Sequence, residues 1–325
     1  MEAYLGIDVG SVTTKFALLD EKDELMAHLY LPTQGKPIVM VQQGLREIQR
    51  QLGDFRLGGV ATTGSARYLA GVIVGADLVK NEITCHAVAS LHHHPEVQTI
   101  IEIGGQDSKM IIVRDGVVVD FAMNTVCAAG TGSFLDHQAQ RLHLSIEEFS
   151  RRSLESRTPV HIAGRCTVFA ESDMVHKQQM GHRTEDILYG LCQALVRNYL
   201  NNVGLGKDVQ SPILFQGGVA FNQGILRALK EALGTEVIIP PHHEVMGAIG
   251  AALLVHEEMA LSKRPTRFQG FGISELEYHT STFQCKACPN LCEIAQLSRN
   301  GKVLARWGGR CDQWERVSDR EGGSK

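Results

Sequence analysis

The sequence lacks long hydrophobic runs and a strong excess of charge of either sign. No apolar run reaches the roughly 18 residues that a membrane-spanning helix requires, so we expect no membrane association. The 325 residues include 32 Lys and Arg against 36 Asp and Glu, a formal charge of −4, which does not favour a nucleic-acid partner. The N-terminal segment MEAYLGIDVGS has neither the basic nor the apolar region of a secretory signal. We therefore expect a cytoplasmic protein.

Two common nucleotide-binding motifs are also missing. The sequence contains neither G-x-x-x-x-G-K-[ST] nor G-x-G-x-x-G, which excludes the P-loop and Rossmann types of phosphate-binding loop.

The eight cysteines would lie in a reducing compartment, where buried residues, metal ligands or redox groups are commoner than disulfides. The length predicts about two domains.

The chain contains an internal repeat. Residues 101–113 align without gaps on residues 7–19 and share one pattern: an apolar strand, an acid, a glycine turn, a hydroxyl, a lysine and a second apolar strand. The aligned pairs include Asp8/Glu102, Gly10/Gly104, Thr14/Ser108 and Lys15/Lys109. A second turn of similar chemistry at a domain-sized separation predicts two similar lobes. Two unrelated β-hairpins are the alternative.

The two glycine turns are candidate phosphate sites, because backbone N–H groups in such turns point at phosphate oxygens. Asp8 and Asp107 are candidate Mg²⁺ ligands, since Mg²⁺ prefers a few carboxylates together with water and phosphate oxygens. We group them with Gln106 as candidate catalytic residues. Lys15 and Lys109 either contact phosphate or are solvated on the second strand of each hairpin.

A third glycine turn, Gly217-Gly218, follows the apolar run 213–215 and precedes a predicted helix over 224–233. Without a Cβ, these glycines would let a base or ribose lie against the backbone. The candidate nucleotide-binding residues of the three turns are Gly10, Ser11, Thr13, Thr14, Lys15, Gly104, Gly105, Gly217 and Gly218. Apolar spacing predicts another helix over 37–52.

In this order the three turns resemble the motifs of the sugar kinase/heat-shock-protein-70/actin superfamily. Residues 8–15 resemble its first phosphate motif, residues 102–109 its second, and residues 216–220 its adenosine motif. The Ala- and Gly-rich residues 246–261 resemble the helix at its interlobe hinge, where small side chains permit close approach of another helix. The resemblance implies an α/β, two-lobed fold of the ribonuclease-H-like actin/Hsp70/sugar-kinase type, with a Cys-rich C-terminal tail.

The expected domain boundaries follow from this resemblance and from a change of composition after residue 265. We expect the first ATPase lobe at 1–94, joined by the helix near 246–261, and the second lobe at 95–245. Residues 262–325 are expected to form a linker and the Cys-rich tail.

Cys127 and Cys166 each lie among Gly, Ala and Thr just before a predicted helix, over 134–142 and 168–178 respectively. A thiolate at a helix N-terminus is stabilised by the helix dipole and by free N–H groups, and the same placement suits an anionic iron–sulfur cluster. Such a cluster takes four thiolates. A two-fold dimer would supply the missing pair.

The segments 124–134 and 164–173 closely resemble motifs of the ATP-dependent activators of 2-hydroxyacyl-CoA dehydratases and of the ATPase subunits of benzoyl-CoA reductase, the BadF/BadG/BcrA/BcrD type of ATPase. The resemblance covers roughly residues 4–260. It implies a homodimer in which Cys127 and Cys166 of both chains hold one bridging [4Fe–4S] cluster. It also implies ATP hydrolysis between the lobes, with ADP as product, and oxygen sensitivity.

The same resemblance implies the partners. A low-potential electron would pass to an iron–sulfur dehydratase or reductase acting on a CoA ester, and ferredoxin or flavodoxin would be the donor. The sequence leaves a double-cubane-cluster protein open as acceptor. A conventional small-molecule kinase and a non-enzymatic ATP-dependent scaffold of the same fold are the competing functions, and both leave Cys127 and Cys166 unexplained.

The tail carries a four-thiolate set formed by Cys285, Cys288, Cys292 and Cys311. Zinc or a second iron–sulfur cluster both fit such a set, and an unoccupied tail is the alternative. The segment resembles the Cys-rich part of larger activase proteins, in which more chain follows, so the sequence is interpreted either as a fragment or as a naturally short protein.

Four other features receive structural interpretations. Cys85 and Cys192 are expected to be buried on helix faces. The run His92-His93-His94 is interpreted as a solvated loop, and residues 242–243 as a loop near the nucleotide.

Overall fold

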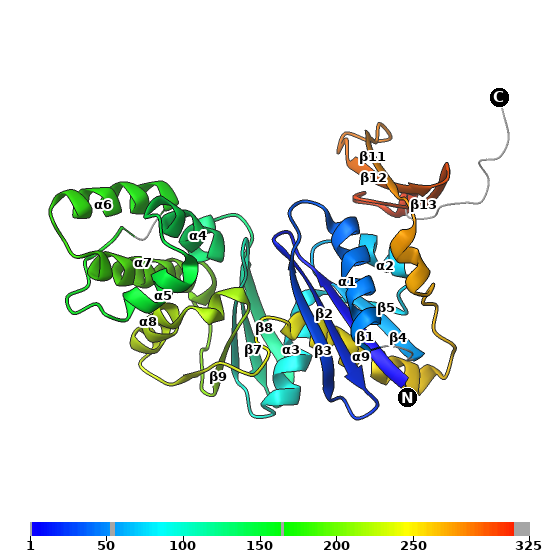
Figure 1. Ribbon diagram of the computed structural model, residues 1–325, viewed down its shortest axis with the longest axis horizontal. Helices are drawn as coiled ribbons and strands as arrows, with labels where there is room; N and C mark the ends of the chain where they lie inside the picture. Colours follow the sequence, from blue (N-terminus) through cyan, green and yellow to red (C-terminus); the bar gives the residue numbers. More distant parts are fainter. Residues whose placement is uncertain (1, 53–55, 164–165, 315–325) are drawn as a thin grey trace. The chain divides into compact units, whose positions relative to one another are not determined.

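The computed structural model describes residues 2–52, 56–163 and 166–314 (Figure 1). By their internal contacts, these residues divide into two units, one of residues before 82 together with those after 250, and the other of residues 82–250. Each unit contains a five-stranded sheet covered by helices, and the first also carries a three-stranded sheet.

The sheet of the first unit has the strand order β3-β2-β1-β4-β5. β1 pairs antiparallel with β2 and parallel with β4. The strands are β1 (Glu2–Val9), β2 (Thr13–Asp20), β3 (Leu25–Pro32), β4 (Arg56–Thr63) and β5 (Leu78–Val79). The two apolar strands that the sequence predicts around the first glycine turn are therefore confirmed as an antiparallel pair. The predicted helix over 37–52 is also confirmed, as α1 (Pro37–Leu52).

Helices cover both faces of this sheet. Leu5, Ile7 and Phe16 pack in one apolar core with α1 and with α2 (Arg67–Val74). On the other face a Cβ added at Gly59 would meet Val255 and Met259 of α9 (Met246–Ser262). Burial on both faces explains why β1 is almost continuously apolar rather than alternating.

The second sheet repeats the first, strand for strand. Its order is β10-β9-β6-β7-β8, in which β6 pairs antiparallel with β7 and parallel with β9. The strands are β6 (Thr99–Ile103), β7 (Ser108–Arg114), β8 (Val117–Asn124), β9 (Ile213–Gln216) and β10 (Val237–Ile238). The prediction of two similar lobes is confirmed by this common topology.

Alternate residues of β6 face two different cores. Ile101 and Ile103 belong to the larger core, whereas Ile100 packs with α3 (Glu82–His93). The larger core is built with five helices, which lie together beside the sheet in Figure 1: α4 (Gly132–Arg141), α5 (Ile146–Ser153), α6 (Thr167–Gln179), α7 (Thr184–Tyr199) and α8 (Gln223–Leu233). The last of these is the helix that the sequence predicts over 224–233.

The boundary between the units differs from the expected one at residue 94. Ile83 and Ala87 of α3 pack against strands of the second sheet, so α3 belongs to the second unit. His92 and His93 form the last turn of α3, and the expectation of a loop there was wrong for these two residues. Burial lowers the pKa of His93, which favours its neutral form.

Buried cysteines and close helix packing agree with the sequence. Cys85 and Cys192 are buried on helices, and burial raises the pKa of Cys192 to about 12. A Cβ added at Gly250 of α9 would collide with the backbone of Cys85. The predicted close approach at the small residues of this helix is confirmed, because only glycine leaves room there.

The segment expected to be a linker is docked on the first unit. The buried carboxylate of Asp77 accepts hydrogen bonds from the Thr266 hydroxyl at 2.6 Å and the Arg267 N–H at 2.8 Å. Gln42 of α1 donates to the carbonyls of Ile273 and Leu276. Beyond it, β11 (His279–Gln284), β12 (Glu293–Arg299) and β13 (Lys302–Trp307) form an antiparallel sheet in that order.

Short helical turns complete the described chain. They lie at Ala128–Gly130, Leu200–Gly204, Gly218–Phe221, Phe271–Glu275 and Asp312–Trp314. Among the helices described, none is long and apolar enough to cross a membrane.

Candidate functional site

The first glycine turn joins β1 to β2. Its ends are closed by the Gly10 N–H, which donates to the Thr13 carbonyl at 2.9 Å. Directly before and after the turn, Asp8 and Lys15 are opposite each other in the strand register, and the Lys15 ammonium donates to the Asp8 carboxylate at 3.0 Å. Ser11 is exposed at the tip of the turn. The Asp8 carboxylate is thus held beside the backbone of the turn.

The second glycine turn, between β6 and β7, has the same bonds. The Gly104 N–H donates to the Asp107 carbonyl at 3.0 Å, and Lys109 is opposite Glu102 in the strand register. Gln106 is exposed at the tip. The repeat in the sequence therefore corresponds to two turns with one hydrogen-bonding plan.

Lys109 is the centre of an ionic cluster. Its ammonium donates to Glu102 at 2.8 Å and to Asp107 at 2.9 Å, and it lies 3.5 Å from a carboxylate oxygen of Glu82. The side chain is 2% exposed, so the alternative of a solvated lysine is wrong. Burial alone would lower the pKa of Lys109, but the three carboxylates outweigh it and raise the pKa.

The charge of this cluster suits a divalent cation. Three carboxylates around one ammonium leave an excess of negative charge beside the turn, where Asp107 is partly exposed. Glu82 comes from α3, and the sequence reasoning did not find it. No short motif links it to the turn, because it reaches Lys109 only through the packing of α3 on the sheet.

The second glycine turn is bonded directly to the segment that carries Cys127. At the start of α4, the N–H groups of Gly132 and Ser133 donate to the carbonyls of Gly104 and Gly105, each at 2.8 Å. The Ser133 hydroxyl also donates to the Gly105 carbonyl, at 2.5 Å. Sequence reasoning had assigned no role to Ser133.

Cys127 is held through its backbone by Asn124. The Asn124 side chain accepts the Cys127 N–H at 2.9 Å and donates to the Cys127 carbonyl at 2.8 Å. Cys127 begins the short 3-10 helix Ala128–Gly130, and α4 starts only at Gly132. The predicted helix after Cys127 is present, but the helix that Cys127 itself begins is a single turn.

Cys166 is the N-cap residue of α6, as its position in the sequence predicts. Glu171 of α6 pairs with Arg141 of α4 at 2.6 Å, so the two helices that follow the cysteines are tied together. Asp173 accepts the Ala163 N–H at 2.9 Å. The residues 164 and 165 of the predicted motif lie outside the described part of the chain.

The third glycine turn follows β9. Gly217 has φ +92°, and a Cβ there would meet the Ile103 carbonyl at 2.6 Å and a Glu102 carboxylate oxygen at 2.7 Å, so the position requires glycine. Its N–H donates to the His243 carbonyl at 2.9 Å. The preceding Gln216 is buried and its amide bonds to His86 at 2.8 Å, which makes it a structural residue.

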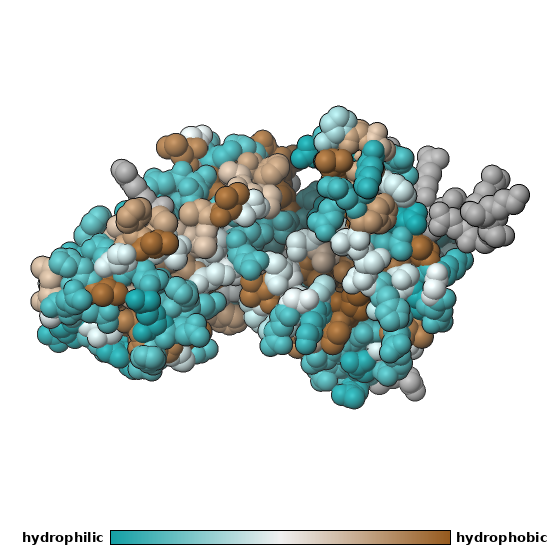
Figure 2. Space-filling model, turned by 90° about the horizontal axis from the view of Figure 1, so that it is seen from above, coloured by the Kyte–Doolittle hydropathy of each residue, from teal (hydrophilic) through white to brown (hydrophobic). Residues whose placement is uncertain are grey.

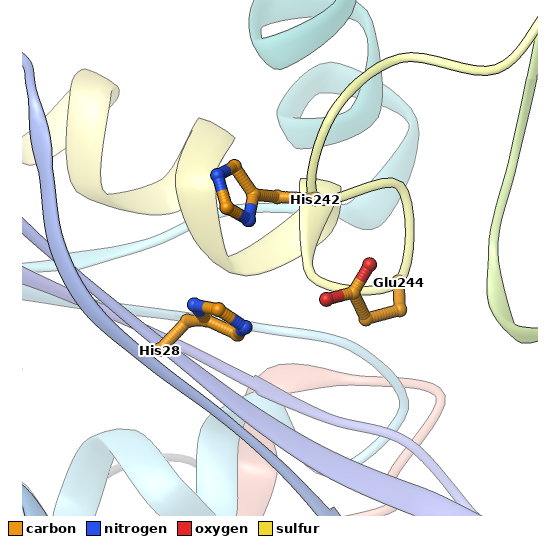
Figure 3. A group of neighbouring side chains, drawn as sticks. All are labelled: His28, His242 and Glu244. Carbon is orange, nitrogen blue, oxygen red and sulfur yellow. The ribbon is translucent and has the colours of Figure 1, made fainter.

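Figure 3 shows His242 and Glu244 on the loop that leads into α9, and in the sequence they flank His243. His28, drawn in the same figure, belongs to β3 of the first unit. The His243 ring packs edge-on against Phe221 at 4.4 Å. The expectation of a loop for 242–243 is confirmed, and the bond from Gly217 ties that loop to the third turn.

The four tail cysteines lie at one end of the small sheet. Cys285 follows β11, Cys292 precedes β12, and the Cys285 N–H donates to the Cys292 carbonyl at 2.8 Å. Cys311 follows β13, whose last residues pair with the start of β12. Within the described chain, no three of these thiols come within 4.8 Å of one another. The Trp314 indole and the Ala287 N–H lower the pKa of Cys285.

A family model for the BadF/BadG/BcrA/BcrD ATPase family matches residues 5–255. The chain belongs to this family. The match ends before the linker and the Cys-rich tail, and it contains all three glycine turns together with Cys127 and Cys166. Membership confirms the resemblance that the two cysteine motifs carry.

Individual relatives are similar over the same part of the chain. The (R)-2-hydroxyglutaryl-CoA dehydratase activating ATPase of Acidaminococcus fermentans is 35% identical over 266 residues, covering 79% of this chain and 98% of the relative. A component of the benzoyl-CoA reductase of Thauera aromatica is 26% identical over 281 residues, covering 80% and 96%.

Solved structures show the same fold. Component A of the A. fermentans dehydratase superposes with a TM-score of 0.76 at 32% identity, covering 80% of this chain and all of that one. The activator of 2-hydroxyisocaproyl-CoA dehydratase from Clostridium difficile, solved with bound ADPNP, gives a TM-score of 0.73 at 32% identity, covering 80% and 97%. The expected two-lobed α/β fold is confirmed.

Proposed function

We propose that this ATPase is an iron–sulfur activator, which couples ATP hydrolysis to the transfer of a low-potential electron to a dehydratase or reductase acting on a CoA ester. One observation carries the proposal. The loop that holds Cys127 is hydrogen-bonded to the second glycine turn at Gly104 and Gly105, so a phosphate-binding element and a candidate cluster ligand share one rigid contact.

The glycine turns are assigned to the nucleotide. Backbone N–H groups of the turns would bind the phosphates, and Asp8 and Asp107 would hold Mg²⁺, directly or through water. Gln106 is exposed at the tip of its turn, where its amide could orient the attacking water, as a glutamine does in other nucleotide hydrolases. The products are ADP and phosphate. The relative from C. difficile with bound ADPNP supports nucleotide binding.

Cys127 and Cys166 are assigned to a [4Fe–4S] cluster shared by two chains. Both thiols are free and partly exposed. Cys127 precedes a single 3-10 turn, and Cys166 is the N-cap residue of α6. The surroundings suit an interface: Val126 is 95% exposed, and Val168 and Phe169 beside Cys166 are each 67% exposed. On the face drawn in Figure 2, apolar patches lie among hydrophilic side chains.

When bound, the cluster would accept one electron from ferredoxin or flavodoxin and release it to the partner. The chain's own residues supply the rest. Asn124 fixes the backbone of Cys127, and the Glu171–Arg141 ion pair keeps the helices after the two cysteines together. Relatives named as a dehydratase activating ATPase and as part of a benzoyl-CoA reductase support an iron–sulfur dehydratase or reductase as the acceptor.

A redox titration of the anaerobic dimer tests the coupling. The protein is titrated with ADP, with a non-hydrolysable ATP analogue, and with ADP plus a phosphate mimic. The proposal requires the cluster's potential or its sensitivity to a chelator to differ between at least two of these states, because a ligand shifts an equilibrium only through differential affinity. Equal values in all three states, with partner binding independent of nucleotide, would contradict it.

For the tail we propose a second metal site, at which Cys285, Cys288, Cys292 and Cys311 bind zinc or a second iron–sulfur cluster. The position of all four at one end of a small sheet supports this. Binding must draw their thiols closer than they lie in the structure. Metal analysis of the Cys127→Ala variant isolates the tail: zinc or iron that disappears on adding Cys288→Ser and Cys311→Ser supports the site. A Cys127→Ala variant that binds no metal although its tail is unchanged would contradict the site.

A further inference from the structure

Residues 124–133 are attached to the second glycine turn at both of their ends. At one end Asn124 is paired with Ser108 in the β7–β8 register, and Ser108 directly follows the turn. At the other end the Gly132 and Ser133 N–H groups donate to the turn's carbonyls. Cys127 lies between these two anchors. Because both ends are fixed to the same turn, a change in the turn's shape must be taken up by the segment that carries the thiol.

The contact at the start of α4 is close. A Cβ added at Gly132 would meet the Gly104 carbonyl at 3.1 Å and the Gly105 Cα at 3.3 Å, so the helix backbone touches the turn directly. The two N–H bonds exist whatever the side chains are. The Ser133 hydroxyl donates to the Gly105 carbonyl at 2.5 Å. Of these three hydrogen bonds, this is the one that depends on the identity of a side chain.

The first unit has an equivalent contact between its glycine turn and the chain that follows its third strand. There the chain leaving β3 returns to its own glycine turn at once: the Thr33 hydroxyl donates to the Gly10 carbonyl at 3.0 Å, and the Thr33 N–H donates to the Val12 carbonyl at 2.7 Å. In the second unit the equivalent carbonyl, that of Gly104, is reached by Gly132, after the intervening residues 125–131. The contact is common to both repeats, and the cysteine-bearing segment is inserted into it.

We propose that Ser133 is the positioning residue through which the nucleotide at the second glycine turn controls the exposure of the Cys127 thiol. The inference deepens the proposed function and depends on its nucleotide site, but it does not require a bound cluster. ATP and ADP differ at the phosphate that such a turn would contact, so they favour different positions of the Gly105 carbonyl. The Ser133 hydroxyl makes the start of α4, and with it the Cys127 segment, follow that carbonyl.

Alkylation of Cys127 measures this link without a cluster. The full-length, metal-free protein is treated with iodoacetamide at saturating ADP or non-hydrolysable ATP analogue, with saturation established separately for each variant. Peptide mass spectrometry then gives the labelling rate of Cys127. One hydrogen bond contributes about 1 kcal/mol, or about fivefold. We expect the wild-type rates to differ between the nucleotides by about this factor, and Ser133→Ala to lower the ratio, because the variant keeps only the two N–H bonds to the turn.

The controls separate positioning from general destabilisation. Ser145→Ala removes the matched hydroxyl at the start of α5, which accepts the Glu148 N–H, and should keep the wild-type ratio. Ser133→Thr should restore it. A variant that is merely destabilised would label faster with both nucleotides and keep their ratio. The inference is overturned if Ser133→Ala retains the wild-type ratio. It is also overturned if Cys127 of the wild type is labelled at the same rate with bound ADP and with the bound ATP analogue. Absence of nucleotide binding would overturn the proposed function itself, whereas absence of iron alone would leave this inference standing.

Discussion

Lys109 lies opposite Glu102 across β6 and β7, and its buried ammonium donates to the Glu102 carboxylate at 2.8 Å. At the corresponding register position of the first sheet, Lys15 lies opposite Asp8 and donates to its carboxylate. Two turns thus have an acid and a lysine at the same positions. In the second unit, Asp107 and Glu82 join the pair, so the buried lysine balances more than one carboxylate.

Replacing Lys109 should cost far more stability than replacing a lysine whose carboxylate partner is half exposed. Lys109→Met leaves the buried Glu102 carboxylate without its cation, and breaking a buried pair in this way costs about 3–5 kcal/mol. Lys207, whose partner Asp120 is half exposed, is the matched control, and its Met variant should lose at most about 1 kcal/mol. Urea unfolding measures both. Equal losses in the two variants would show that the cluster around Lys109 contributes little.

Asp8→Asn and Asp107→Asn should each reduce ATP hydrolysis by more than about tenfold, which corresponds to roughly 1.4 kcal/mol of lost transition-state stabilisation. The reason is that both carboxylates are assigned to Mg²⁺ beside the phosphates. Asp208→Asn alters an exposed acid paired with Arg114 and should leave turnover unchanged. Steady-state phosphate release at several Mg²⁺ concentrations is the measurement. Wild-type turnover in both variants would refute the assignment of the turns.

Asn124→Ala should loosen cluster binding. The variant loses both hydrogen bonds to the Cys127 backbone, each contributing about 1 kcal/mol, so we expect iron to be lost to a chelator at least about fivefold faster. Asn222→Ala is the matched control, because Asn222 is a buried asparagine that caps α8 through the Ile225 N–H. It should cost about 1 kcal/mol of stability without changing iron release. The same release rate in both variants would mean that Asn124 does not position Cys127.

Asp186 should make the stability of the second unit depend on acid pH. Burial alone would raise its pKa, but hydrogen bonds from Ser156, Arg157 and Thr158 lower it below the usual value. The folded state therefore binds this proton less readily than the unfolded chain, whose Asp titrates near about 3.9. The resulting stability is present above that pH and is lost as the pH falls below it.

The measurement is urea unfolding of Asp186→Asn and wild type at pH 7 and pH 3. At pH 7 the variant should be less stable by about 1–3 kcal/mol, and the difference should narrow at pH 3. Asp115→Asn, an exposed turn position, should stay within about 0.5 kcal/mol of wild type. A difference that is independent of pH would exclude the titration of Asp186 as its cause.

Local patterns predicted the repeat and its turns. The aligned Asp8 and Glu102, each followed by a glycine turn and a lysine, were enough to predict two similar lobes, because strand pairing is set locally by a tight turn. The helix over 37–52 was equally clear from its apolar spacing. Cys166 was correctly placed at a helix start, directly before α6.

The remaining parts depend on packing between distant segments. Glu82 joins Lys109 only because α3 lies on the second sheet, and Asp77 holds Thr266 and Arg267 across most of the chain. Neither contact leaves a local pattern. The histidines at 92 and 93 were interpreted as a loop because polar residues precede a strand there, whereas the buried face of α3 extends the helix to His93. The hydroxyl of Ser133 was overlooked because its partner is a backbone carbonyl.

Iron content and the number of chains, measured together in one native mass spectrum of the anaerobic protein, test the central claim most directly. The account predicts a dimer of two chains with one four-iron cluster that Cys127→Ala removes while the protein stays folded, because the thiolates lie at a surface. The comparison with Cys127→Ala separates this cluster from metal in the tail. A wild-type monomer with a full cluster, a dimer without iron, or a variant that keeps the same iron as wild type would contradict it.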